Sequence, residues 1–376
     1  MAFNVGVLKE TSPGERRVAM VPRAVELLSK LGAQLWIETA AGSAAGFSDS
    51  EYEAKGAHIA DSPQAVRDKA QVLLCVRIPH PSLVSAGQIL IGFCDPLGQP
   101  NLAQEIADRG ATLFSMEFVP RITRAQAMDA LSSMASIAGY KAVLLAANEL
   151  PRMFPMMMTA AGTVPPARVF IIGAGVAGLQ AIATARRLGA VVSAYDVRPA
   201  VKEEIQSLGA KYVSITVEGG AGEGGYARQM DEESIRYQRE QMALTLQEQD
   251  VVIATAAVPG KKAPLLITKE MVHRMAPGSV IVDLAAERGG NCELTRPGQT
   301  IVAEGVTILG PLNLPATVPY HASQMYARNV VSFLKNIVKN GELNVDVADE
   351  ITRETLVARN GEVVHPKVQA LLGVVA

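Results

Sequence analysis

Short apolar runs alternate with helical segments along the first 120 residues of the chain. Pro22 opens one such helix, which carries Val25, Leu28 and Leu31 on one face and ends at Gly32. The expected strands cover residues 5–8, 35–38, 71–76, 89–93 and 112–118, and the other expected helices cover residues 49–55, 63–69 and 102–109. Alternation of this kind predicts right-handed crossovers and a parallel sheet with helices on both faces.

The pattern changes near Ala125, where residues 125–149 form one long helical run with no proline and a single glycine, Gly139. This run predicts a helix long enough to bridge two domains. A passage rich in methionine and proline follows at residues 151–166, and a second series of strands begins after Ala167. Its expected strands cover residues 169–172, 191–196, 212–215, 251–254, 279–283 and 306–309, and a further helix is expected over residues 319–340.

The composition suits about two domains, because 376 residues with 49% hydrophobic content are enough for two cores. The 35 lysines and arginines nearly balance the 37 aspartates and glutamates, so no basic surplus indicates a nucleic-acid partner. Cys75, Cys94 and Cys292 lie far apart and form no CxxC pair, which argues against a disulfide framework and a zinc site. The histidines show no metal-ligand spacing either, so no metal is expected.

The N-terminus lacks a charged segment followed by an apolar run, so no export signal is expected. The longest apolar stretch, residues 169–185, is interrupted by glycines and polar residues, and it predicts a buried strand entering a helix. We therefore expect a cytoplasmic chain in which no segment spans a membrane.

The sequence VFIIGAGVAG at residues 169–178 has the GxGxxG spacing of a dinucleotide-binding turn between an apolar strand and a helix. Gly173 would permit the tight turn, Gly175 would let the backbone approach a pyrophosphate, and Gly178 would let helix and strand pack closely. The amides near Val176 and Ala177 would then face the phosphate charge.

Asp196 ends the next strand, eighteen residues after Gly178. A carboxylate there accepts hydrogen bonds from the adenosine ribose hydroxyls and repels a 2′-phosphate, which favours NAD over NADP. Arg198, after Val197, complicates this choice, because a nearby arginine can hold a 2′-phosphate. We expect Arg198 to cover the adenine or to stay solvated.

These features predict an α/β chain of two Rossmann-like domains, each with a mainly parallel sheet, joined by long helices and with a cofactor in the cleft between them. Residues 1–140 and 316–376 would form the first domain, to which the C-terminal tail returns. Residues 141–315 would form the NAD(H)-binding domain. The glycine-rich tract at residues 219–226 would follow a strand of that domain and is equally consistent with a mobile lid over the cofactor and with a plain surface linker.

The whole length resembles the soluble NAD(H)-binding component of proton-translocating nicotinamide nucleotide transhydrogenase, and more distantly alanine dehydrogenase. The motifs that carry this resemblance are GVLKE at 6–10 with ERRVAMVP at 15–22, PRITRAQAMDALSS at 120–133, the glycine turn with YDVR at 195–198, and GGYAR at 224–228. The second and fourth are specific to the transhydrogenases, whereas the first is shared with alanine dehydrogenases.

The resemblance implies roles for individual residues. Gln126, Arg121 and Asp129 would act at the nicotinamide end, where Gln126 reaches the second nicotinamide and the other two orient the first ring and its ribose. The remaining implied cofactor contacts are Ser132, Gly225, Tyr226, Gln238 and Ala257. The resemblance also implies NADP(H) on a partner subunit, membrane-spanning subunits that carry the proton path, a homodimer of this chain at the inner face of the cell membrane, and little activity of the chain alone.

The residues that an alanine dehydrogenase uses are mostly replaced in this sequence. Its catalytic histidine would fall in CDP at 94–96, its catalytic aspartate matches Glu287, and its substrate lysine matches Arg77. Only Arg17, which matches the arginine that binds the substrate carboxylate, remains. Oxidative deamination needs proton-transfer groups of the lost kinds, so it is not expected here. An amino-acid dehydrogenase is the first alternative to the transhydrogenase component, and a non-enzymatic NAD-sensing module is the second.

Overall fold

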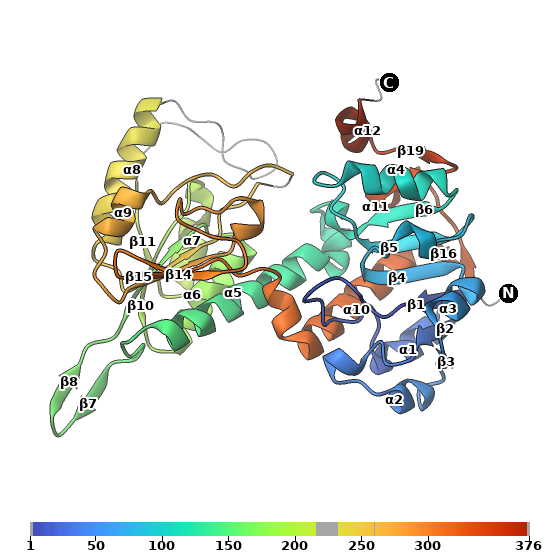
Figure 1. Cartoon of the computed structure of the whole chain (residues 1–376), viewed down its shortest axis with the longest axis horizontal. Helices are drawn as coiled ribbons and strands as arrows, with labels where there is room; N and C mark the ends of the chain where they lie inside the picture. The colour runs from blue at the N-terminus through green and yellow to red at the C-terminus, as the bar shows by residue number, and fades with distance from the viewer. Residues whose placement is uncertain (1–2, 216–231, 259, 374–376) are drawn as a thin grey trace. The chain divides into compact units, whose positions relative to one another are not determined.

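The computed structural model of the chain describes residues 3–215, 232–258 and 260–373, with the backbone alone at residues 232–235 and 238 (Figure 1). The chain divides into two compact units. Unit 1 consists of Met1–Met134 and Pro315–Ala376, and unit 2 consists of Ala135–Leu314.

Unit 1 is built on an eight-stranded sheet in the order β19-β18-β6-β5-β4-β1-β2-β3. The strands from β6 to β3 run parallel. From the C-terminal part of the chain, β18 pairs antiparallel with β6, and β19 pairs antiparallel with β18 at the edge of the sheet. The strands are β1 (Phe3–Val7), β2 (Ala33–Glu38), β3 (His58–Ala60), β4 (Val72–Arg77), β5 (Ile89–Phe93), β6 (Thr112–Ser115), β18 (Leu356–Arg359) and β19 (Glu362–Val363).

Helices cover both faces of this sheet. Val66 of α3 and Ile106 of α4 join a buried cluster on one face, and Phe333 of α10 packs edge-on against Phe114 of β6 on the other, with ring centroids 5.3 Å apart. Many of these helices begin with proline, whose fixed φ suits the first helical position. The helices are α1 (Pro22–Ser29), α2 (Asp49–Glu53), α3 (Pro63–Lys69), α4 (Pro100–Asp108), α10 (Pro319–Ile337), α11 (Glu350–Thr355) and α12 (Pro366–Leu372).

Short elements complete unit 1. They are the 3₁₀ turns η1 (Ser43–Ala45), η2 (Pro81–Leu83), η3 (Met116–Phe118) and η4 (Thr123–Met128), and the small hairpin of β16 (Val338–Lys339) and β17 (Glu342–Leu343). The 3₁₀ turn η8 (Leu314–Thr317) lies at the chain boundary between the units.

Unit 2 holds a seven-stranded sheet in the order β11-β10-β9-β12-β13-β15-β14, in which only β14 is antiparallel among the described strands. The chain runs from β9 outward to β11 and then returns to β12 on the other side of β9, so the strand order reverses between β9 and β12. Ligands of open α/β sheets bind at the carboxyl ends of the strands at such a reversal. The strands are β9 (Arg168–Ile172), β10 (Val191–Tyr195), β11 (Lys211–Tyr212), β12 (Val251–Ala254), β13 (Val280–Asp283), β14 (Thr300–Ala303) and β15 (Val306–Leu309).

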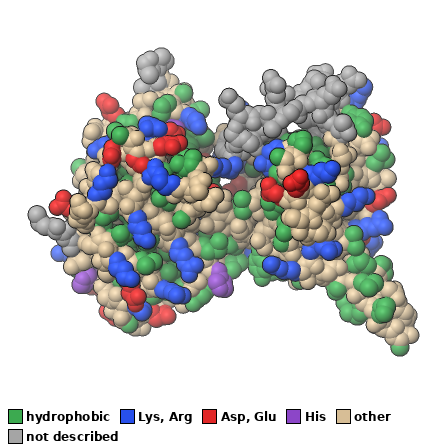
Figure 2. Space-filling view, turned by 180° about the vertical axis from the view of Figure 1, so that it is seen from behind, with side chains coloured by type: hydrophobic (Ala, Val, Ile, Leu, Met, Phe, Trp, Pro, Cys, Tyr) green, Lys and Arg blue, Asp and Glu red, His purple; other side chains and the backbone are tan. Residues whose placement is uncertain are grey.

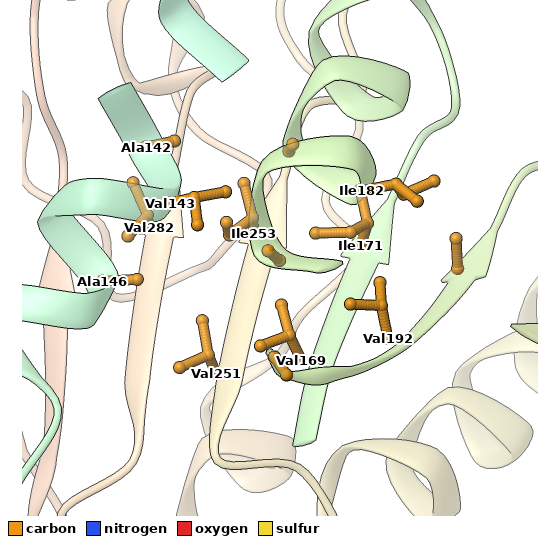
Figure 3. Packing of buried hydrophobic residues seen from close by; sticks show 14 of the residues in the cluster. Ala142, Val143, Ala146, Val169, Ile171, Ile182, Val192, Val251, Ile253 and Val282 are labelled. Atoms are coloured by element: carbon orange, nitrogen blue, oxygen red, sulfur yellow. The ribbon is translucent and has the colours of Figure 1, made fainter. Parts of the chain in front are cut away.

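Both faces of this sheet are buried, which explains the continuous apolar runs in the sequence. Val169 and Ile171 of β9 face a cluster with α5, α6 and α7, whereas Phe170 and Ile172 face α8 and α9. Figure 3 shows Ala142, Val143 and Ala146 of α5 directed at the strands on the first of these faces. The helices are α5 (Ala130–Glu149), α6 (Val176–Arg187), α7 (Lys202–Ser207), α8 (Glu232–Leu246) and α9 (Lys269–His273), with the 3₁₀ turns η5 (Pro199–Val201) and η7 (Ala286–Arg288).

The predicted α/β class with mainly parallel sheets is confirmed, but one long element was predicted wrongly. Residues 125–149 are not a single helix, because η4 ends at Met128 and α5 begins at Ala130. Asp129 lies between them and accepts hydrogen bonds from the amide and hydroxyl of Ser132, at 2.8 and 2.6 Å. A side-chain oxygen that accepts from an amide of the first turn marks a helix start, so α5 begins here.

Two other predictions need correction. The strand expected at residues 112–118 ends at Ser115 and continues as η3, and the one expected at residues 212–215 consists of Lys211–Tyr212 only. The passage rich in methionine and proline contains an unexpected hairpin, β7 (Met157–Thr159) with β8 (Gly162–Val164), whose strand residues are all exposed. Figure 2 shows hydrophobic side chains gathered on this hairpin.

Among the described residues, α5 is long and apolar enough to cross a membrane by length and composition alone. Its 20 residues include a window of mean hydropathy 1.4, of which 39% is buried. However, Ala142, Val143 and Ala146 belong to the buried core of unit 2. A core helix satisfies the same criterion, so the apolar composition of α5 does not by itself indicate a membrane span.

Gly139 of α5 lies directly against the backbone of α6. A Cβ atom at this position would be 2.0 Å from the carbonyl oxygen of Ala177 and 3.1 Å from its Cα. Backbone cannot yield as a flexible side chain can, so only glycine fits here without displacing one of the two helices.

We predict that Gly139→Ala destabilises unit 2 by about 1–3 kcal/mol or more, the usual cost of overpacking, despite the better helix propensity of alanine. The midpoint of urea unfolding, followed by far-ultraviolet circular dichroism, measures this. Asn148→Ala, an exposed substitution near the end of the same helix, is the control and should change little. An unchanged or raised midpoint for Gly139→Ala would contradict the close packing.

Candidate functional site

The glycine turn follows β9 at the strand reversal of unit 2. Gly173 has a φ of +93°, which disfavours any side chain, and a Cβ atom at Gly178 would lie 1.9 Å from the carbonyl oxygen of Gly173. At Gly175, in contrast, no described heavy atom lies within 4 Å of an added Cβ. Glycine is therefore needed at position 173 for the turn and at position 178 for the close packing, whereas open space lies beside Gly175.

The helix after this turn starts without a side-chain cap. Gly175 is the N-cap residue of α6, and Val176 is 42% exposed. The leading amides of a helix carry a partial positive charge and lack partners within the helix. The start of α6, at Val176 and Ala177, is therefore suited to hold a phosphate group.

Thr255 supports the turn from the neighbouring strand, a role that the sequence did not reveal. It follows β12, and its hydroxyl lies 3.0 Å from the carbonyl oxygen of Gly173 and 3.2 Å from that of Ile172. A polar residue directly after the apolar run of residues 251–254 was the available signal. Its value depended on knowing that β12 pairs with β9.

Asp196 follows β10 and connects the end of that strand to the glycine turn. Its carboxylate accepts a hydrogen bond from the amide of Ala174 at 2.7 Å. Burial raises the pKa of Asp196, but hydrogen bonds from Arg198 and from the Ala174 amide outweigh this effect, and the net pKa is lowered. The side chain is only 6% exposed and is ionised at neutral pH.

Arg198 forms an ion pair with Asp196 that the sequence did not predict. Its Nε and Nη2 atoms bind the two carboxylate oxygens of Asp196 at 2.9 and 3.0 Å, and its own amide donates to the same carboxylate at 2.9 Å. Together with the Ala174 amide, these donors fill the roughly four acceptor positions of a carboxylate. A ribose hydroxyl that binds Asp196 must therefore displace the guanidinium, since it is the most easily moved donor.

The structure describes only some of the other residues of unit 2 that are expected to contact the cofactor. Val197 is half-buried and packs against a core cluster, and Ala257 is exposed, three residues beyond β12. Gln238 lies in α8, but its side chain is not described, and Gly225 and Tyr226 lie outside the described residues. Whether the glycine-rich tract is a lid or a linker falls outside them as well.

In unit 1, the loop that contains η4 presents side chains from a fixed backbone. Arg124 binds Asn336 and Asp349 at 3.0 and 2.6 Å, and the side-chain amide of Asn329 donates to the carbonyl of Ala127 at 3.0 Å. Arg121 and Gln126 on this loop are exposed. Asp129 and Ser132 are half-buried and bind each other at the start of α5.

A second polar cluster lies at the carboxyl ends of β1 and β4. Arg17 is buried and forms an ion pair with Glu15, from its Nη2 to Oε2 at 2.6 Å, and Arg77 reaches the same oxygen at 3.4 Å. Glu10 accepts hydrogen bonds from the amides of Val76 and Arg77. Burial raises the pKa of Glu10 to about 7, despite these hydrogen bonds.

Comparison with known proteins identifies relatives over nearly the whole chain. Residues 6–138 match the N-terminal domain of alanine dehydrogenase/PNT, and residues 142–366 match its C-terminal domain. The chain is 44% identical over 377 residues to a protein of Rhodospirillum rubrum named as the first part of NAD(P) transhydrogenase subunit alpha, covering 97% of this chain and 98% of the relative.

One solved structure and one more distant relative agree with this assignment. The structure of a transhydrogenase from Sinorhizobium meliloti has a TM-score of 0.88 and 46% identity, covering 96% of this chain and 100% of that one. Alanine dehydrogenase of Bacillus subtilis is 28% identical over 380 residues, covering 98% of this chain and 94% of the relative.

The raised pKa of Glu10 predicts a stability that depends on pH. Between its ordinary value of 4.5 and about 7, the folded chain holds a proton that the unfolded chain releases, so stability falls as pH rises through this window. Glu10→Gln should remove this loss and gain up to about 3 kcal/mol over the parent at pH 8, with little difference at pH 4.5. Urea unfolding at several pH values measures it.

Glu105→Gln, at an exposed glutamate of α4, is the matched control and should leave the pH profile of the parent unchanged. A constant difference between Glu10→Gln and the parent across the window would show that Glu10 is ionised throughout.

Proposed function

The chain belongs to the alanine dehydrogenase/PNT family, and from this premise we propose that it is the NAD(H)-binding component of a proton-translocating NAD(P) transhydrogenase. In this role NAD(H) binds to this chain and NADP(H) to a partner subunit. The observation that carries the proposal is the buried Asp196 carboxylate, held 2.7 Å from the Ala174 amide of the glycine turn.

The residues of unit 2 fit the adenosine and pyrophosphate parts of the cofactor. The open space beside Gly175 and the uncapped start of α6 suit a pyrophosphate. Asp196 would accept the ribose hydroxyls, and its negative charge would repel a 2′-phosphate. Arg198, displaced from Asp196, would then contact the adenine, and Val197 would lie beside it.

For the nicotinamide end we propose the residues of the loop at 120–133. The nicotinamide supplies the hydride chemistry, so the protein has to hold donor and acceptor carbons about 3–3.5 Å apart and keep water out. Gln126 would reach toward the second nicotinamide, and Arg121 and Asp129 would orient the first ring and its ribose. Further proposed cofactor contacts are Ser132, Gly225, Tyr226, Gln238 and Ala257.

The buried cluster of unit 1 argues against the amino-acid dehydrogenase. The guanidinium of Arg17 is already neutralised by Glu15, with side chains that are 3% and 0% exposed. A substrate carboxylate would have to break a buried ion pair, which usually costs several kcal/mol. The position after β5 also offers Cys94 and Asp95 in place of the histidine that an alanine dehydrogenase would use.

Partners and location follow from the same role. We propose that the chain forms a homodimer and docks at the inner face of the cell membrane through NADP(H)-binding and membrane-spanning subunits. The name of the Rhodospirillum rubrum relative, which describes it as belonging to a subunit, supports a multi-subunit assembly. The exposed apolar side chains of the β7–β8 hairpin, such as Met158 at 75%, are consistent with a contact surface.

Reconstitution tests this function. The purified chain is mixed with the NADP(H)-binding subunit of the same system, and reduction of an NAD analogue by NADPH is followed by absorbance. The exchange should require both proteins, and the chain alone should show little turnover. Robust NAD reduction by the chain alone with L-alanine or another L-amino acid would favour the dehydrogenase. NADH binding without any exchange would favour the sensor.

The role of Gln126 gives a separate prediction. Gln126→Asn shortens the side chain by one methylene without changing its chemistry, so hydride exchange should slow about tenfold or more, since misplacement by 1 Å costs up to about 10²-fold. NADH affinity should stay within about twofold, because adenosine and pyrophosphate contacts dominate binding. Single-turnover exchange and calorimetry measure the two quantities. Equal losses of rate and affinity would contradict this role.

A further inference from the structure

The side chain of Asn291 makes hydrogen bonds to both Ala256 and Pro264, which lie in the segment that follows β12. Its Oδ1 accepts from the amide of Ala256 at 3.0 Å, and its Nδ2 donates to the carbonyls of Ala256 at 2.8 Å and Pro264 at 2.9 Å. Asn291 is completely buried. A primary amide both accepts and donates, whereas a carboxylate of the same shape only accepts. The three bonds therefore require asparagine among residues of this size.

Asn291 is itself held by Asp283, the last residue of β13. The Oδ2 atom of Asp283 accepts from the amides of Asn291 and Cys292 at 2.8 and 2.9 Å and from the hydroxyl of Thr295 at 2.6 Å. Gly290 has a φ of +81°, and a Cβ atom there would lie 2.7 Å from this oxygen. These contacts fix the backbone around Asn291 independently of the hydrogen bonds that its side chain makes to the segment after β12.

The segment held in this way lies at the strand reversal of unit 2. It starts with Thr255, which binds the carbonyl of Gly173 in the glycine turn, and the exposed Ala257 follows. The glycine turn and Asp196 belong to the β9–β10 side, and β12 lies on the opposite side of β9. A dinucleotide that crosses the reversal with its adenosine on the β10 side places its other nucleotide toward β12.

We propose that Asn291 is a positioning residue for the nicotinamide half of the cofactor. It acts through the backbone of Ala256, which sets the position of Ala257 and of Thr255 beside the glycine turn. This inference rests on the proposed binding of NAD(H), and it adds that the two halves of the cofactor are held by separable parts of unit 2. The loss of Asn291 should affect the nicotinamide half and spare the adenosine half.

The test compares two ligands that share the adenosine half. Dissociation constants of NADH and 5′-AMP are measured by calorimetry for the parent chain, for Asn291→Asp and for Asn291→Ser. We expect Asn291→Asp to weaken NADH about tenfold, because the loosened segment has to be ordered when the nicotinamide half binds, and to change 5′-AMP less than about twofold. Asn291→Ser keeps a small donor and should fall between the parent and Asn291→Asp for NADH.

Thr295→Val is the matched control. It removes a buried hydrogen bond to the same Asp283 carboxylate without touching the segment after β12, so it should lower the unfolding midpoint yet leave the ratio of the two dissociation constants unchanged. Parallel weakening of NADH and 5′-AMP in the Asn291 variants would overturn the positioning role, as would affinities for both ligands that stay at the values of the parent. If the parent binds neither ligand, the proposed function itself fails.

A measurement on the parent chain does not depend on whether the variants fold. Amide hydrogen exchange at Ala256, Ala257 and Val258 is recorded without ligand, with NADH and with 5′-AMP. NADH should slow exchange in this segment at least about fivefold, and 5′-AMP should leave it unchanged. Equal protection by both ligands, or none by NADH, would contradict the inference while leaving the NAD(H) proposal intact.

Discussion

Close approach of backbone to backbone at the glycine turn is the constraint on which unit 2 depends. The carbonyl of Gly173 lies where a Cβ of Gly178 would be, and the carbonyl of Ala177 lies where a Cβ of Gly139 would be. Helices α5 and α6 and strand β9 therefore meet without intervening side chains. This leaves the start of α6 and the amide of Ala174 beside one another, and Asp196 binds the latter from the next strand. Rigid backbone groups, and not flexible side chains, thus form the part of the proposed site that would face a pyrophosphate.

Much of the fold could be predicted because burial on both faces of a sheet leaves a strong pattern. The strands over Ile89–Phe93, Val251–Ala254 and Val306–Leu309 have the bounds expected from their apolar runs. Errors arose where local side-chain bonding overrides the pattern. Asp129 starts a new helix inside a run that is helical throughout by composition, and the exposed β7–β8 hairpin has no buried face that could produce a period.

The site shows the same division between local and distant information. The glycine turn lies in one short stretch, so its three glycines could be assigned to distinct roles, and the geometry at Gly173 and Gly178 bears out two of them. Thr255 and Asn291 act across strand neighbours 82 and 35 residues apart in the chain, and no local motif marks them. The ion pair between Arg198 and Asp196 was also missed, because the sequence spacing alone does not say whether two charges meet.

Affinity for the two coenzymes tests the account most directly. Purified chain is titrated calorimetrically with NADH and with NADPH, and the titration is repeated with Asp196→Ala. The account predicts that the parent binds NADH at least about tenfold more tightly, a modest difference of about 1.4 kcal/mol for a phosphate facing a buried carboxylate, and that Asp196→Ala loses most of this preference. Tighter binding of NADPH by the parent, or binding of neither coenzyme, would contradict the assignment of Asp196 and with it the proposed function.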